Sequence, residues 1–238
     1  MRHFLIPFAA ILAACQSPAE PGDGARSAGR GGERSWGVSG FDSVALAGSH
    51  EVIVATGGAH AVRASGDPAD LDRLEIEVRD GTLHIGQQKS IGWRWNDKVT
   101  VHVSMPAIAA ASIGGSGEMK VGRAAGDAFA ASVGGSGDLS IDDIEAGSAS
   151  FAVAGSGSIG AAGGSARKVG ISIQGSGDVD IAGLAAETAE VEIMGSGDVR
   201  ARVLEAASVS LMGSGDVFIE GGAKCDVSRM GSGDVHCG

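Results

Sequence analysis

The tripeptide Gly-Ser-Gly recurs seven times between residues 115 and 233, and its nearly constant spacing restricts the fold more than any other feature. The first glycines of the seven copies are Gly115, Gly135, Gly155, Gly175, Gly195, Gly213 and Gly231. The spacings between them are 20, 20, 20, 20, 18 and 18 residues. A fixed period of this length is typical of proteins built from stacked copies of one small structural unit.

Apolar residues flank each Gly-Ser-Gly at even distances from its first glycine. Around Gly175 they are Ile171, Ile173, Val179 and Ile181, and most other repeats are apolar at the same offsets. Both glycines of the motif also fall on even positions, so one alternating register runs through two strands and the corner between them. Glycine on the inner side of a corner lets the backbone turn tightly and lets neighbouring turns approach closely.

The fold class that follows is all-β: a single-stranded parallel β-helix, or β-solenoid, with 18–20 residues per coil and right-handed winding. An antiparallel barrel or sandwich of hairpins stays open as an alternative, because one repeat is also long enough to form a hairpin. The constant position of the glycines argues against hairpins, whose alternate strands need no identical corners. Aromatic residues make up only 4% of the chain and Tyr is absent, so the core must consist of Val, Ile, Leu and Ala.

Residues 36–110 are less regular but still strand-like. Short alternating segments occupy residues 49–54, 74–78, 82–85 and 99–103. Asp80-Gly81 fits a tight turn between two of them, and residues 66–71 resemble a short helical turn with an Asp cap. We expect residues 36–110 to form atypical first coils and a cap, in one continuous domain with the regular repeats of residues 111–238.

The N-terminal segment, residues 1–14, reads as an export signal. Arg2 precedes an apolar stretch that is too short to span a bilayer as a helix. The stretch ends in Leu-Ala-Ala before Cys15, which resembles the bacterial lipobox and implies lipidation of Cys15. An ordinary secretory signal followed by an unrelated Cys is the alternative. Gln16 after the Cys implies sorting to the outer membrane, and residues 16–35, rich in Gly, Pro and Ser, read as a flexible tether.

Several segments together resemble the bacterial GIN-domain family of autotransporter-adhesin head domains, formerly a domain of unknown function. They are Trp36-Gly37-Val38-Ser39-Gly40-Phe41, Val78-Arg79-Asp80-Gly81-Thr82-Leu83-His84-Ile85, Val101-His102-Val103-Ser104-Met105-Pro106 and the Gly-Ser-Gly-Asp-Val series. The resemblance covers about residues 36–238. It implies a parallel β-helix on an exported or lipid-anchored protein, and it brings no established reaction, ligand or cofactor.

The charge of the chain excludes one class of partner. The formal net charge is −11, and no cluster of Lys and Arg offsets it locally. Because an acidic surface is repelled by phosphate backbones, nucleic-acid binding is not expected. We also expect no cofactor.

A carboxylate follows the corner in most repeats and faces outward. The last four, Asp178, Asp198, Asp216 and Asp234, are expected to stand in a column about 4.8 Å apart. One interpretation is a ladder that binds Ca²⁺. The simpler interpretation, which we favour, is that each Asp accepts hydrogen bonds from backbone N–H groups at its own corner.

Other candidate residues are few. No Gly-x-Ser-x-Gly nucleophile elbow is present, because Glu118 and Asp138 stand where the second Gly would be. Cys225 and Cys237 both fall on inward positions of the last coil, so either a disulfide that closes the open end of the core or two buried thiols would fit. Arg229 interrupts the apolar column of that coil, as in a capping repeat.

Two exposed apolar groups are candidates for a binding surface. Trp93 and Trp95 share one face of an extended segment, which suits either a glycan platform or packing in a cap. Met194, Met212 and Met230 form an outward column on the last three coils, which suits either a partner or the protein's own chain.

The function predicted from these features is non-catalytic. The chain is expected to be a lipid-anchored protein of the cell envelope, on the membrane through its acyl chains, whose rigid β-solenoid serves adhesion or binding of a protein or glycan. A polysaccharide-binding or polysaccharide-cleaving protein is the first alternative, but no set of carboxylates and cations around an aromatic groove supports it. A periplasmic regulatory or sensor module is the second.

Overall fold

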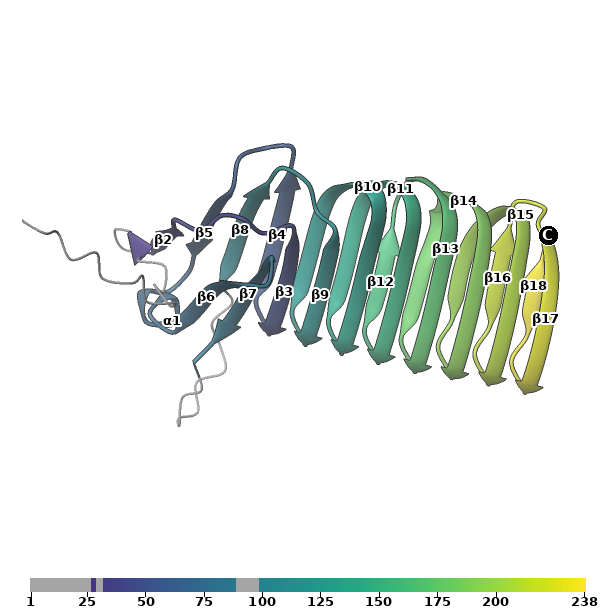
Figure 1. Cartoon of the computed structure of the whole chain (residues 1–238). Helices are drawn as coiled ribbons and strands as arrows, with labels where there is room; N and C mark the ends of the chain where they lie inside the picture. The colour runs from purple at the N-terminus through teal and green to yellow at the C-terminus, as the bar shows by residue number, and fades with distance from the viewer. Residues whose placement is uncertain (1–26, 29–31, 89–98) are drawn as a thin grey trace, which may run out of the picture.

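The computed structural model describes residues 27–28, 32–88 and 99–238, which form one elongated stack of β-coils (Figure 1). The regular part of the stack begins at β9 and ends at β18 near the C-terminus. Its strands are β9 (Ala110–Gly115), β10 (Glu118–Gly135), β11 (Asp138–Gly155), β12 (Ser158–Ala161), β13 (Gly164–Gly175), β14 (Asp178–Gly195), β15 (Val199–Gly213), β16 (Val217–Glu220), β17 (Lys224–Gly231) and β18 (Val235–Cys237).

Each regular coil pairs in parallel with the next coil, one repeat further along the chain. Val133 on β10 lies opposite Val153 on β11, and Ile173 on β13 lies opposite Ile193 on β14. The register shifts between Ile181 and Ala185, which is where the repeat becomes shorter. The predicted β-solenoid is therefore confirmed, and the hairpin barrel or sandwich is wrong.

The inward positions predicted from the even offsets form the core. In the first six repeats these side chains are at most 5% exposed. The second glycines of the corners are buried among them. Only the seventh repeat departs from this pattern: Val227 is 43% exposed, although its equivalent Val209 is 1% exposed.

The irregular N-terminal part contributes the first coils and a cap. Strand β3 (Ser43–Gly48) pairs in parallel with β9, and β4 (Glu51–Thr56) pairs in parallel with β10. On their other sides, β7 (Thr82–Gln87) pairs with β3 and β8 (Thr100–Met105) pairs with β4.

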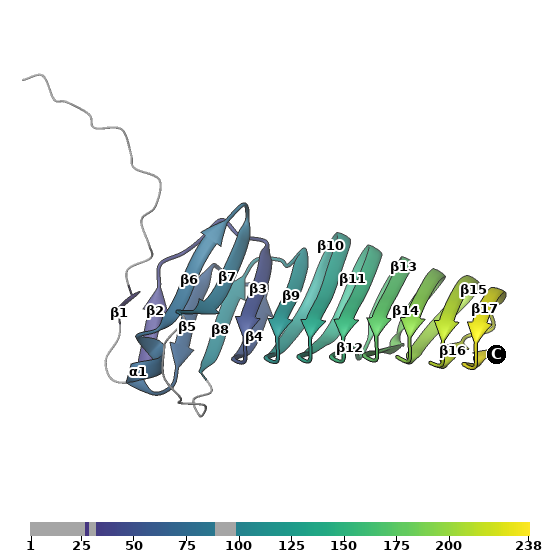
Figure 2. The ribbon, with the colours of Figure 1, turned by 90° about the horizontal axis from the view of Figure 1, so that it is seen from below.

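Antiparallel strands complete the cap. They are β1 (Ser27–Ala28), β2 (Glu33–Trp36), β5 (Ala61–Ser65) and β6 (Leu74–Arg79), together with the single helical turn α1 (Pro68–Leu71). Asp80 and Gly81 both have positive φ in the β6–β7 turn, and Asp67 caps α1 by accepting from the Ala69 N–H. Figure 2 shows α1 at the end of the stack opposite the C-terminus. Across the described ranges, none of the helical structure is long and apolar enough to cross a bilayer.

Candidate binding surfaces

The Gly-Ser-Gly corners stack directly on one another and determine how closely the coils approach. The first glycine of each motif has a positive φ, such as 131° at Gly175. At the second glycine there is no room for a side chain, because a Cβ on Gly177 would lie 2.3 Å from the carbonyl oxygen of Gly157. The serine between them is exposed, and its backbone N–H donates to the glycine carbonyl of the preceding coil, as Ser176 does to Gly155 at 2.8 Å.

The column of aspartates after the corners is a hydrogen-bonded ladder. The backbone N–H of Asp198 donates to Asp178 Oδ1 at 2.9 Å, that of Asp216 to Asp198 at 2.8 Å, and that of Asp234 to Asp216 at 2.9 Å. The prediction that each carboxylate accepts from its own corner is wrong. The carboxylates of Asp178, Asp198 and Asp216 each accept from the backbone N–H of the aspartate one coil further along the chain. Within the described part of the chain, no three His, Cys, Asp or Glu side chains gather closely enough to hold a metal ion.

An eighth corner, which the repeat search missed, begins the stack. The Ser116 N–H donates to the Gly48 carbonyl and the Glu118 N–H donates to the His50 carbonyl, both at 3.0 Å. Residues 48–50 are therefore the equivalent of residues 115–117, with His50 in place of the second glycine. A long segment that contains most of the cap separates the two corners. The spacing of this corner from the next one therefore does not match the period of the repeat. The shared order Gly-Ser-x-Glu, followed by an apolar residue, was the available signal.

His50 is buried in this corner and differs from the other histidines of the cap. It is 2% exposed, and both ring nitrogens lack a hydrogen-bond partner among the described residues. Burial lowers the pKa of His50, so the ring is neutral at pH 7. His84 and His102 face outward and are exposed.

A shallow trough of about 570 Å³ runs along the face formed by β3, β9, β10, β11 and β13. Its floor consists of small outward side chains. They are Ala45, Ala47, Ser112, Gly114, Ser132, Gly134, Ala152, Ala154 and Ser172. Because none of them projects far, the backbone of five stacked strands is open to a flat ligand or to another protein surface.

One margin of the trough carries charge. Glu75, Glu77 and Arg79 project from β6, and His84 projects from β7. Arg79 forms an ion pair with Glu77, and its hydrogen bond lowers the pKa of that carboxyl, while Glu77 raises the pKa of the guanidinium. Gln174 lies at the opposite end of the trough. The trough thus offers hydrogen-bonding groups and a mixed-charge margin, and none of its described lining residues is Phe, Tyr or Trp.

The predicted methionine column is present and exposed. Met194, Met212 and Met230 lie opposite one another on β14, β15 and β17. They are 48%, 46% and 73% exposed, so the protein's own chain covers only part of them. The column ends at the last coil of the stack.

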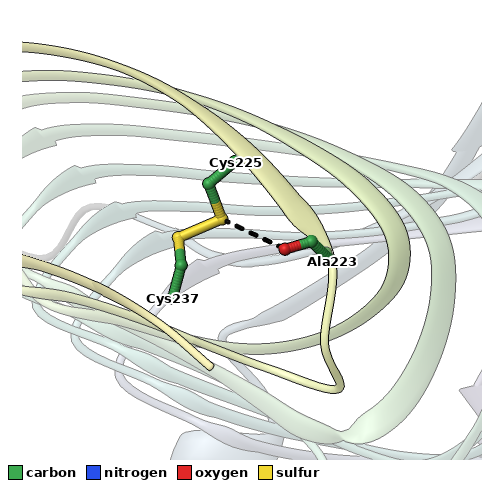
Figure 3. The surroundings of a disulfide bond; sticks show 3 residues. All are labelled: Ala223, Cys225 and Cys237. Carbon is green, nitrogen blue, oxygen red and sulfur yellow. Dashed lines mark hydrogen bonds between the residues drawn. A yellow bond between two sulfur atoms is a disulfide. The ribbon is translucent and has the colours of Figure 1, made fainter.

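Cys225 and Cys237 form a disulfide across the last coil (Figure 3). Their Cα atoms are 6.5 Å apart. The bond joins β17 to β18, the two strands of the last coil that the structure describes. Of the two alternatives predicted for these cysteines, the structure therefore has the disulfide and not two buried thiols.

Three of the predicted site residues lie outside the described residues. They are the lipidation residue Cys15 and the pair Trp93 and Trp95. The structure therefore brings together the aspartates, the methionines and the two remaining cysteines, each group in its own column or coil. The trough had not been predicted, because the small outward residues that form it are separated by a full coil in the sequence.

The described residues define a class of protein: an elongated parallel β-solenoid with a capped N-terminal end and extended repetitive faces. Residues 40–223 match the family described as "Putative auto-transporter adhesin, head GIN domain". The chain belongs to this GIN-domain family. No curated protein sequence matches it.

Solved structures share the fold. A "putative adhesin" from Bacteroides fragilis is 19% identical with a TM-score of 0.78, and the match covers 86% of this chain and 95% of that one. A "putative lipid binding protein" from Parabacteroides distasonis is 21% identical, with a TM-score of 0.69 and coverage of 88% and 97%. A "putative adhesin" from Parabacteroides merdae is 16% identical, with a TM-score of 0.68 and coverage of 86% and 94%. At these identities the likeness concerns the fold.

Proposed function

We propose that the chain is a non-catalytic protein of the cell envelope, anchored by lipid at Cys15, whose rigid solenoid binds a partner protein or glycan. The observation that carries the proposal is the trough, an extended shallow depression. The strands beneath it are held rigid by parallel backbone pairing between successive coils. Membership of a family described by an adhesin head domain supports the same class of function.

The trough suits binding better than catalysis. Polysaccharide-cleaving enzymes place a pair of carboxylates on either side of the scissile bond in a groove that holds the sugar. Here Glu77 is paired with Arg79 on the margin, and the floor is Ala, Ser and Gly. A sensor module is the remaining alternative, and it would use the same face to contact an integral membrane partner.

Binding through the trough can be tested with a matched pair of variants. Ala152→Arg places a long charged side chain on the trough floor, whereas Ser140→Arg places the same side chain at an exposed site outside it. Binding is measured on a glycan array and by pulldown from envelope extracts. We expect Ala152→Arg to reduce the binding signal at least tenfold relative to the unchanged chain, and Ser140→Arg to leave the signal unchanged. Equal binding by both variants would exclude the trough, and turnover of any glycan would overturn the non-catalytic assignment.

The anchor has its own test. Mass spectrometry of the mature N-terminus should find Cys15 as the first residue, carrying diacylglycerol. An unmodified Cys15 or an uncleaved chain would contradict the anchor and leave the trough experiment unaffected.

A further inference from the structure

The two ends of the solenoid are capped differently. At the N-terminal end, β2, β5, β6 and α1 cover the first coils, and Leu71 of α1 is buried at 1% exposure. At the C-terminal end the last coil consists of β17 and β18, and no described element lies beyond it (Figure 1). This end therefore leaves an inward core position open, as the 43% exposure of Val227 shows.

Part of the C-terminal end is already closed by its own side chains. Arg229 Nη1 donates to the Gly233 carbonyl at 3.0 Å and to Asp234 Oδ1 at 2.7 Å. In the inner coils, the equivalent oxygens accept hydrogen bonds from backbone N–H groups of the next coil. The Gly157 carbonyl accepts from the Asp178 N–H, and the Asp216 carboxylate accepts from the Asp234 N–H. Arg229 thus replaces the missing coil at the corner, and the disulfide ties β17 to β18.

The outer edge of β17 is what remains open. Among the described strands, β17 pairs only with β15, so its other edge presents unpaired backbone groups along the whole strand. Val227 and Met230, 43% and 73% exposed, lie on this strand. An exposed strand edge with apolar side chains is a template for pairing with another strand.

The charge of the last coil favours a copy of the same chain as the partner. The whole chain carries a net charge of −11, but residues 224–238 contain two cations, Lys224 and Arg229, and two anions, Asp226 and Asp234. Two such ends can approach without net repulsion. A head-to-tail arrangement is blocked because the N-terminal cap covers the opposite end, so identical ends must meet.

We propose that the β17 edge is a self-association surface, at which two copies of this chain pair antiparallel through β17 about a two-fold axis. Pairing centred on Val227 keeps the core faces of both strands on the same side and places the two Val227 side chains opposite each other. Each Met230 then lies opposite the Lys224 of the other copy and covers its methylene groups. The dimer is a doubled solenoid with the two N-terminal caps at its far ends, a geometry that does not depend on what the trough binds.

Sedimentation equilibrium of the purified chain, with the disulfide intact, tests this surface. We expect a monomer–dimer equilibrium that Val227→Lys weakens at least tenfold, because two like charges then meet on the two-fold axis. Met194→Lys is the matched control: it changes a residue that is 48% exposed, close to the 43% of Val227, and lies two coils from the edge, so it should leave the equilibrium unchanged. Met230→Lys gives a second disrupting variant at a site too exposed to affect folding.

Each other outcome argues against the proposal. If the chain stays monomeric up to millimolar concentration, the β17 edge is not a self-association surface. An extended segment of another protein would then be the remaining candidate partner for this edge. A dimer that neither Val227→Lys nor Met230→Lys weakens, or one that Met194→Lys weakens equally, forms elsewhere on the molecule. Thermal melting of each variant, followed by circular dichroism, verifies that the compared proteins are folded.

Discussion

At the scale of single residues, the second glycine of each corner is fixed by contact with the coil beside it. The closest atom to a Cβ at Gly177 would be backbone, the Gly157 carbonyl oxygen at 2.3 Å, which cannot move aside as a flexible side chain can. We expect Gly177→Ala to lower the free energy of unfolding by about 2–3 kcal/mol through overpacking. Gly170→Ala is the control, because a Cβ there meets nothing within 4 Å, and its effect should stay within about 0.5 kcal/mol.

The comparison of these two variants is made by urea denaturation followed by circular dichroism. Equal effects of Gly177→Ala and Gly170→Ala would mean that the corners can separate without cost. The corner stack would then not determine the spacing of the coils.

His50 makes the stability of the first corner depend on pH. Burial lowers its pKa from the ordinary value of 6.5, so between that value and its folded-state pKa the unfolded chain binds more protons than the folded one. The free energy of unfolding therefore falls as the pH drops below 6.5, by up to about 1.4 kcal/mol per unit, and this contribution stops changing below the folded-state pKa. Urea denaturation at pH 7.5, 6.5 and 5.5 measures it.

The variant His50→Leu should lose this part of the pH dependence, whereas His102→Asn, at an exposed histidine, should keep it. An unchanged slope in His50→Leu would assign the dependence to other groups. The period of the repeat did not reveal the burial of His50, although the order Gly-Ser-x-Glu was there to be read. Most of the cap separates its corner from the next one along the chain, and a histidine occupies the position at which the repeat search requires glycine.

At the scale of the strands, alternation predicted the regular coils well because each inward position repeats in register. The direction of the aspartate bonds could not be predicted in the same way. A linear pattern specifies that Asp198 faces outward, but which N–H lies within reach of its carboxylate depends on how one coil is placed over the next. The antiparallel strands of the cap were equally hard to predict, since β5 and β6 belong to no repeat and both partners of β5, the strands β2 and β8, lie far from it in the sequence.

The aspartate ladder should contribute to stability through these bonds. Removing the Asp198 carboxylate leaves the Asp216 N–H without its acceptor, so Asp198→Ala should cost about 1–2 kcal/mol in the free energy of unfolding. Asp198→Asn keeps an oxygen acceptor and should cost less than half as much. Asp142→Ala, at an exposed carboxylate outside the ladder, is the control, and an equal loss in all three variants would contradict the role of the bond.

At the scale of the whole molecule, the chain is a one-dimensional stack in which each coil contacts only its neighbours. Stability in such a stack is close to a sum of coil and interface contributions. An inner coil has two interfaces and the last coil has one, so opening should require more free energy for β11 and β13 than for β17 and β18. The disulfide offsets this weakness, because it ties the two strands of the coil with the fewest neighbours.

Hydrogen exchange can measure this gradient along the stack, at a protein concentration low enough to keep the chain monomeric. In the oxidised protein we expect protection to be highest in β11, β13 and β14 and to decline toward β18. Replacing Cys225 and Cys237 by Ser should lower the opening free energy of the β17 and β18 amides by about 2–3 kcal/mol and leave the middle coils almost unchanged. A loss of protection spread evenly over all coils would instead mean that the solenoid unfolds as one cooperative unit, with its last coil as firmly held as its first.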